Sequence, residues 1–435
     1  MKSIQGVEAV RNIKAVGRVL CPGLVCAAVL GLASPRTQAQ SLEEQYAFYL
    51  SAKCTNLQFD RIDGEVFDDL VPGQAGAELD AFCSGTPSVG GGSSSESAST
   101  GVGATSGAAA DAALRRRQAS LRSGKEGEAG GGDEFGILAS GRTSLFGSFN
   151  YARDDQKARR FEGGRRVDQL ALTLGVDWRL GTTGLLGIAA GIEDQSGDLD
   201  AGGTIDNRGY SAILYGSWLP APAVFVDLSG GLVQRDIETS RTVSFTRTFN
   251  NGGGPVVVES IAPARAESKT DQQEWRGALL TGYDWQFGGS GLGPRLALEY
   301  RRSRIDGVVE SGATPMTLRI DQQTEKSLRG GLGLQASRVM NTTSAVFVLQ
   351  LNADWWHEFQ DDQRFIEARF AQDLRPNPVR LRYQNQPPDR DVFTSRLSLG
   401  VTMPRGFSAF LSVDALFGHS YLEHYGAGLG LRKEL

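Results

Sequence analysis

Three histidines, His357, His419 and His424, are the first residues to consider for acid–base or metal chemistry. His419 directly precedes Ser420, and a serine activated by a histidine is a common hydrolase nucleophile. On a β-strand, however, adjacent side chains point to opposite faces, which disfavours direct proton transfer between these two residues. The sequence also lacks HExxH, GxSxG and paired CxxC motifs. We therefore expect no enzymatic activity, no cofactor and no catalytic metal. Loss of a hydrolytic activity on substitution of His419 would contradict this expectation.

The cysteines offer a second kind of chemistry. Residues 1–39 resemble a secretory signal, in which basic residues precede an apolar stretch and cleavage follows Ala39. Cys54 and Cys83 remain in the mature chain, where an oxidising compartment favours a disulfide between them. The segment 40–83 carries two short helical patterns, so we predict a small disulfide-linked helical segment. A metal site or a reactive thiol is the alternative, but no histidine lies nearby.

Two further segments precede the main body of the chain. Residues 84–107 are rich in glycine, serine and alanine and predict a flexible linker. Residues 108–124 are rich in helix formers and predict an α-helix. Its basic residues are Arg115, Arg116, Arg117 and Arg122. A solvated charged helix is one interpretation. Its position just before the first predicted strand favours a helix lying inside a pore.

Residues 136–435 alternate apolar and polar side chains with a period of two, as in a strand with one apolar and one polar face. In the segment LALTLGVDWRL the apolar positions are Leu170, Leu172, Leu174, Val176 and Trp178. A helix would scatter these side chains around its circumference. The fold class predicted is therefore all-β, a transmembrane antiparallel β-barrel of about twelve strands.

Connection lengths support the same fold, because they alternate between short and long. The expected strand centres are Phe149, Leu174, Ile188, Leu214, Leu228, Thr281, Leu298, Leu332, Leu351, Leu399, Val413 and Leu429. Tryptophans expected in the interfacial girdles are Trp178, Trp218, Trp285, Trp355 and Trp356.

Acidic side chains on the polar face of these strands are expected to face the lumen. They are Asp177, Asp227, Asp284, Glu299, Asp354 and Asp414. We predict that they form ion pairs with the arginines of the helix 108–124.

The chain resembles the translocator domain of autotransporters, the type V secretion family. The resemblance is carried by YSAILYGSW, VFVDLSGGL, EWRGALLTGYDWQF, LGPRLALEYRRSRIDGVVESG and SLRGGLGLQAS in that order, and by the closing GAGLGLRKEL. It implies a twelve-stranded outer-membrane barrel, a helix through the pore, and insertion by the outer-membrane assembly machinery with periplasmic chaperones. Leu435 departs from the aromatic residue usual at the end of this family. Residues 101–135 contain no asparagine, so self-cleavage by asparagine chemistry is not expected.

The expected function is a monomeric outer-membrane barrel that exports or displays its own short N-terminal segment at the cell surface. The net charge of -5 and the lack of a basic domain argue against nucleic acid as a partner. The alternative is a porin-like channel or a surface-adhesive barrel without a cargo role. In that alternative, residues 241–260 and 364–383 extend as β-ribbons beyond the membrane.

Overall fold

The structure is a computed structural model of the whole chain. It describes residues 86–88, 143–159, 163–200, 202–249, 257–312, 317–360, 365–371, 378, 380–384, 389–404 and 407–434. The predicted signal segment, cysteine pair and arginine-rich helix lie outside these residues.

Twelve antiparallel strands form a closed barrel within the described part of the chain. The strands are β2 (Thr143–Gln156), β3 (Arg165–Leu180), β4 (Gly184–Leu199), β5 (Gly203–Ala221), β6 (Val224–Phe249), β7 (Val257–Tyr283), β9 (Ser290–Ile305), β13 (Gln323–Asn341), β14 (Val346–Glu358), β17 (Asp391–Met403), β18 (Phe407–Phe417) and β19 (Leu422–Glu434). All twelve predicted strand centres lie in these strands, one in each, so the predicted strand count is confirmed.

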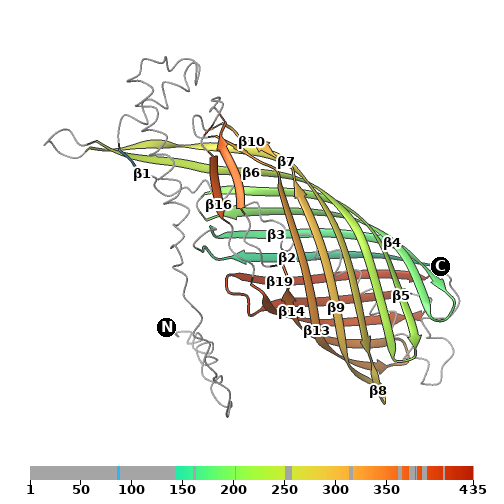
Figure 1. Cartoon of the computed structure of the whole chain (residues 1–435). Helices are drawn as coiled ribbons and strands as arrows, with labels where there is room; N and C mark the ends of the chain where they lie inside the picture. The colour runs from blue at the N-terminus through green and yellow to red at the C-terminus, as the bar shows by residue number, and fades with distance from the viewer. Residues whose placement is uncertain are drawn as a thin grey trace, which may run out of the picture. The chain divides into compact units, whose positions relative to one another are not determined.

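The barrel closes where its last strand, β19, pairs with its first, β2. Leu422 lies opposite Gln156 at one end of this seam, and Glu434 lies opposite Ser144 at the other. Closure gives every edge a partner, which a strand in lipid requires because no water is available to satisfy its backbone. Figure 1 shows the tilted strands wrapping around one enclosed space.

The predicted alternation of faces is confirmed along the strands. On β3, Leu170 and Leu174 are exposed outward, while Thr173 and Asp177, at alternate positions, are buried inside. The outward face carries large apolar residues on every barrel strand. This arrangement inverts that of a water-soluble protein and matches a barrel surrounded by lipid.

Short turns join the strands at one end of the barrel, which we call the short-turn end. The turn between β3 and β4 contains Gly181 with a φ of 66°, and the turn before β9 contains Gly288 and Gly289 with φ of 52° and 83°. Glycine adopts this left-handed conformation without a steric penalty, which permits the tight reversal. A short strand, β8 (Trp285–Phe287), pairs with β9 at this turn.

At the opposite, long-loop end, β6 and β7 continue as a ribbon beyond their neighbours (Figure 1). Their pairing continues from Arg241 to Phe249, which lies opposite Val257. The described residues of the range 241–260 thus form the β-ribbon that the alternative interpretation predicted.

A second, four-stranded sheet also lies outside the barrel wall. It consists of β10 (Val308–Val309), β12 (Leu318–Ile320), β15 (Phe365–Phe370) and β16 (Arg380–Gln384). Two short strands join the barrel sheet instead: β11 (Ser311–Gly312) pairs with β7, and β1 (Thr86–Ser88) pairs with β6. The pairing of β15 with β16 confirms the second predicted ribbon.

Among the described residues, no helix has the length and hydrophobicity needed to cross a bilayer.

Candidate functional site: the barrel lumen and its mouth

The inner wall of the barrel holds buried charges that pair across strands. Arg235 of β6 forms ion pairs with Glu193 of β4 and with Glu274 of β7, the second at 3.2 Å. The Arg235 side chain is fully buried, so its charge depends on these carboxylates. Gln169 of β3 donates to Glu193 at 3.4 Å and continues the network around the wall.

A second cluster lies on the adjoining part of the wall, which begins at β9, the neighbour of β7. Arg295 of β9 forms an ion pair with Asp354 of β14, donating through Nε at 2.6 Å, and also donates to Asn352 at 2.8 Å. Glu299, four residues further along β9, accepts from Arg329 of β13 at 2.7 Å. These contacts reach across several strands and fix their lateral positions.

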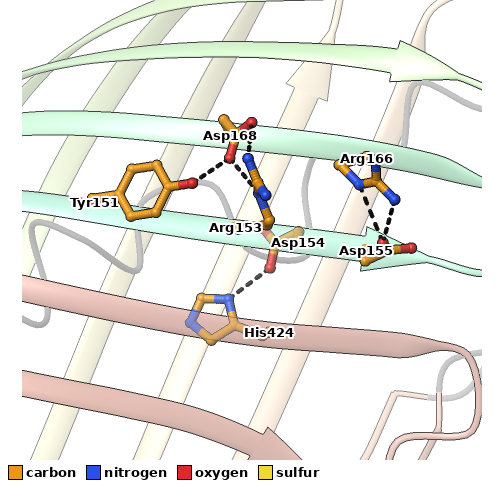
Figure 2. Close-up of polar contacts among 7 residues, drawn as sticks. All are labelled: Tyr151, Arg153, Asp154, Asp155, Arg166, Asp168 and His424. Carbon is orange, nitrogen blue, oxygen red and sulfur yellow. Dashed lines mark hydrogen bonds and ion pairs between the residues drawn. The ribbon is translucent and has the colours of Figure 1, made fainter. Parts of the chain in front are cut away.

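The third cluster joins the last two strands to the first. His424 of β19 lies between Asp154 of β2 and Asp414 of β18, with nitrogen–oxygen distances of 2.6 Å and 3.2 Å. Figure 2 shows His424 directed toward Asp154 across the seam. Arg396 of β17 approaches Asp414 at 3.5 Å. The histidine therefore ties the closing strand to both of its neighbours.

Five of the six acidic residues predicted to face the lumen are on the inner face. Asp177, Asp227 and Asp354 are buried, and Glu299 and Asp414 are partly buried. Asp284 instead lies between β7 and β8 at the short-turn end, where it accepts from Gln286 at 3.2 Å. Because Arg115, Arg116, Arg117 and Arg122 lie outside the described residues, their pairing with these carboxylates stays a prediction.

A cavity of about 270 Å³ lies inside the barrel. It is bordered by the charged side chains of the second and third clusters, together with Glu274, Arg276 and Trp356. Near the short-turn end Phe146, Leu185, Ile213 and Tyr215 pack together, and the Tyr215 hydroxyl donates to the buried Asp177 at 3.0 Å. The inner wall therefore combines charged side chains around the cavity with a small apolar cluster beside Asp177.

The long-loop mouth is held together by a buried ion pair that the sequence did not reveal. Arg241 of the β6 ribbon donates to both oxygens of Glu310, at 2.9 and 2.7 Å, and both side chains are 1% exposed. Glu310 also accepts the backbone N–H of Leu318 at 2.8 Å. Leu318, Ile320 and Ile366 of the adjoining strands β12 and β15 are also buried. The loops thus form a compact structure anchored on the ribbon.

His419 and Ser420 lie between β18 and β19, so the premise that they occupy a strand is wrong. His419 Nδ1 accepts the Leu422 N–H at 3.1 Å, and the Ser420 hydroxyl donates to Asp389 at 3.0 Å. Burial lowers the pKa of His419, while the Asp389 carboxylate opposes this effect. These contacts give both residues an anchoring role in the loop. Among the described residues, no cluster of three metal-ligand side chains occurs.

Aromatic side chains line both ends of the outward face. Trp178, Trp218, Trp285 and Trp355 point outward as predicted, but Trp356 is 5% exposed and faces the lumen, where its indole donates to Thr394 at 3.0 Å. Adjacent residues on a strand cannot both face lipid, which explains the error. The outward aromatic residues at the long-loop end include Tyr151, Tyr210, Trp275, Tyr300, Trp355 and Tyr425.

A closed antiparallel barrel with a polar lumen, an apolar outer face and two aromatic girdles defines the class of bacterial outer-membrane barrels. A family model for the autotransporter beta-domain matches residues 145–414. The chain therefore belongs to the autotransporter β-domain family, and its barrel is embedded in the outer membrane. The short-turn end is periplasmic and the long-loop end extracellular.

Solved structures of similar fold agree. The translocator domain of the autotransporter NalP from Neisseria meningitidis is 14% identical and has a TM-score of 0.52, covering 78% of this chain and 100% of that chain. The beta domain of the Bordetella autotransporter BrkA is 13% identical and has a TM-score of 0.45, covering 68% and 100% of the two chains. At these identities the first likeness shows the fold alone.

A curated relative is described as an uncharacterized protein in the trpE-trpG intergenic region of Pseudomonas putida. It is 26% identical over 197 residues, which span 45% of this chain and 31% of the relative. The match therefore covers less than a third of that relative.

Proposed function

We propose that the barrel carries its own N-terminal segment to the cell surface. Residues 40–83 are the exported segment, 84–107 are its linker, and the helix 108–124 remains in the lumen. The observation that supports this proposal is the pairing of β1 with the distal part of β6, where Thr86 lies opposite Thr248 and Ser88 opposite Thr246.

The position of that pairing relative to the membrane follows from the register. Leu232 of β6 pairs with Trp275, one of the extracellular girdle residues. From Leu232 to Thr246 the strand rises roughly 35 Å, at about 3.3 Å per residue and a tilt of about 40°. A chain segment bound at Thr246 is therefore well outside the bilayer.

The first barrel strand begins at the other side of the membrane. Thr143 of β2 pairs with Trp178, a residue of the periplasmic girdle. In this proposal the chain between Ser88 and Thr143 crosses from the extracellular to the periplasmic side. Lipid cannot accommodate its backbone without internal hydrogen bonding, so the polar lumen is the favoured path. The inward-facing carboxylates Asp177 and Asp227 favour an arginine-rich segment there.

In this proposal the barrel acts as a conduit and an anchor, and it is not an enzyme. Two contacts support this view: the Ser420 hydroxyl donates to Asp389, and His419 Nδ1 accepts the Leu422 N–H, so neither contact is the histidine–serine pair of a hydrolase. The proposed barrel is a monomer and uses the outer-membrane insertion machinery and periplasmic chaperones during assembly.

Export can be tested by surface accessibility of a tag inserted after Gly91. We expect the tag to bind antibody and to be digested by protease on intact cells. A tag protected in intact cells but digested after outer-membrane permeabilisation would place the segment in the periplasm and refute the proposal.

The pairing of β1 with β6 can be tested separately by cross-linking. In a background with Cys54 and Cys83 replaced by serine, Ser88→Cys and Thr246→Cys should form a disulfide on intact cells. Ser88→Cys with Thr242→Cys is the matched control, because Thr242 lies four residues from the paired position. Equal cross-linking in both variants would contradict the register.

The second proposed function is a channel or surface-adhesive barrel without cargo. The observation that favours it is the folded extracellular structure formed by the β6–β7 ribbon and the four-stranded sheet, which projects beyond the barrel. Single-channel conductance of the purified protein would favour the channel, whereas a surface-accessible N-terminal segment favours the exporter.

A further inference from the structure

Two basic side chains lie beside each other on the outward face of the barrel. Arg302 of β9 is in register with Lys326 of β13, and both are exposed. They alternate with Ser303 and Glu325, which are buried on the inner side. Because directly paired residues share one face of a sheet, Arg302 and Lys326 both point toward the lipid side.

Their height along the barrel corresponds to the extracellular membrane interface. Arg302 pairs on its other side with Trp275, which is 61% exposed. Tyr300, two residues closer to the membrane centre, is also exposed. Outward aromatic residues mark the boundary between hydrocarbon and headgroups. The two cations therefore lie at the headgroup level of the outer leaflet.

Neither cation is neutralised by the protein. Among the described residues, the side chains of Arg302 and Lys326 form no hydrogen bond or ion pair. The adjacent outward Arg304 is paired with Asp306 at 3.3 Å. Like charges placed directly opposite on neighbouring strands repel each other. An anion bound between Arg302 and Lys326 would remove this repulsion and make the pairing favourable.

On the other side of the barrel, β2 and β3 also carry outward arginines at the extracellular interface, but these arginines form ion pairs. Figure 2 shows Arg153 bound to Asp168, at 2.7 Å, and Arg166 bound to Asp155, at 3.1 Å. These arginines are also outward-facing and exposed. The carboxylates of Asp168 and Asp155 neutralise these two arginines. At the outer leaflet, this side of the barrel therefore has paired cations, whereas the side with Arg302 and Lys326 has cations without a carboxylate partner in the described part of the chain.

We propose that Arg302 and Lys326 form a binding site for a phosphate-bearing lipid headgroup of the outer leaflet. The arginine offers a planar pair of N–H donors to two phosphate oxygens, and the lysine adds a mobile point charge. The Trp275 ring beside them contacts the lipid where headgroup and acyl chain meet. The site requires only the membrane orientation of the barrel and is independent of whether the N-terminal segment is exported.

The test compares lipid binding by the full-length protein in a neutral detergent. The probes are lipopolysaccharide, its dephosphorylated form and inorganic phosphate alone. The double variant Arg302→Gln, Lys326→Gln should bind lipopolysaccharide about 30-fold more weakly than wild type, since each basic side chain near an anionic surface contributes about a factor of five. The dephosphorylated form should not distinguish the two proteins.

The matched control is Arg153→Gln, Arg166→Gln, which removes the same charge at the same height. Its affinity should fall less than three-fold, and heat-modified migration on gels verifies that both variants are folded. Equal loss in both double variants would indicate a diffuse charge effect and overturn the proposal, as would no loss in either. Displacement of the lipid by millimolar inorganic phosphate would make the site a free-phosphate site and overturn the assignment to a lipid. Arg302→Lys keeps the positive charge, so a smaller loss of affinity in this variant than in the double variant would support the proposal.

Discussion

The ion pair between Arg241 and Glu310 should determine whether the extracellular loops stay folded. The substitution Glu310→Gln keeps the size and shape of the side chain but removes its charge. The Arg241 guanidinium, 1% exposed, then loses its ion pair with Glu310, and one of the two acceptor oxygens at 2.7 and 2.9 Å is replaced by an NH₂ group. Breaking a buried pair in this way costs about 3–5 kcal/mol. The barrel wall has no part in this pair and should keep its stability.

Hydrogen exchange provides the measurement, because the Leu318 amide donates directly to Glu310. A loss of about 3–5 kcal/mol in local stability predicts exchange about 10²- to 10⁴-fold faster at Leu318 and its neighbours in β12. Amides of the barrel strand β3 should exchange as in wild type. Limited proteolysis on intact cells should cleave the segment after Ile305 only in the variant.

The double variant Arg241→Met, Glu310→Leu separates two explanations. Apolar residues of similar volume often replace a buried ion pair at little cost, so protection should return close to the wild-type value. Wild-type exchange in Glu310→Gln would refute the reasoning, because the pair would then contribute nothing. Exchange in the double variant as fast as in the single variant would show that the size and shape of these side chains matter more than the unpaired charge.

Two further predictions concern pH and packing. Burial lowers the pKa of His419 in the folded protein, so its contribution to loop stability is complete above the unfolded pKa of about 6.5 and is lost as the pH falls below that value. Protection of the Leu422 amide from hydrogen exchange should therefore decrease toward pH 5. The variant His419→Gln should not show this pH dependence. In Gly175→Ala the new Cβ would lie 2.3 Å from the Phe146 ring, so the free energy of unfolding should fall by about 1–3 kcal/mol, measured as a lower urea midpoint. The control is Gly230→Ala, whose Cβ would lie 3.8 Å from its nearest atom and should leave the urea midpoint close to the wild-type value.

The wall of the barrel was predictable because its pattern is repeated and local. Each strand alternates between lipid and lumen, so Leu174 and Asp177 could be assigned to opposite faces from sequence alone. Trp356 was wrongly assigned to the girdle because it was grouped with Trp355 by residue type, whereas the alternation puts these two adjacent residues on opposite faces. All twelve barrel strands lie within residues 136–435, because the alternation and the spacing of turns recur along this whole part of the chain.

The mouth of the barrel was less predictable because its contacts join distant segments. Arg241 and Glu310 lie in separate loops, and nothing in the local pattern pairs them. The same applies to Arg235, whose partners Glu193 and Glu274 come from two other strands. A ribbon within residues 241–260 was predicted from the length of this external connection, but the four-stranded sheet was not.

The seam between β2 and β19 has a consequence for the order of assembly. It joins thirteen residues of the last strand to the first strand of the barrel. Until β19 arrives, the free edge of β2 has a row of unsatisfied N–H and C=O groups, each costing several kcal/mol in hydrocarbon. A partial barrel is therefore not a stable intermediate in lipid. A chain that lacks its final strand should be lost to degradation in the periplasm, and the newly made edge needs a temporary partner strand until the ring is complete.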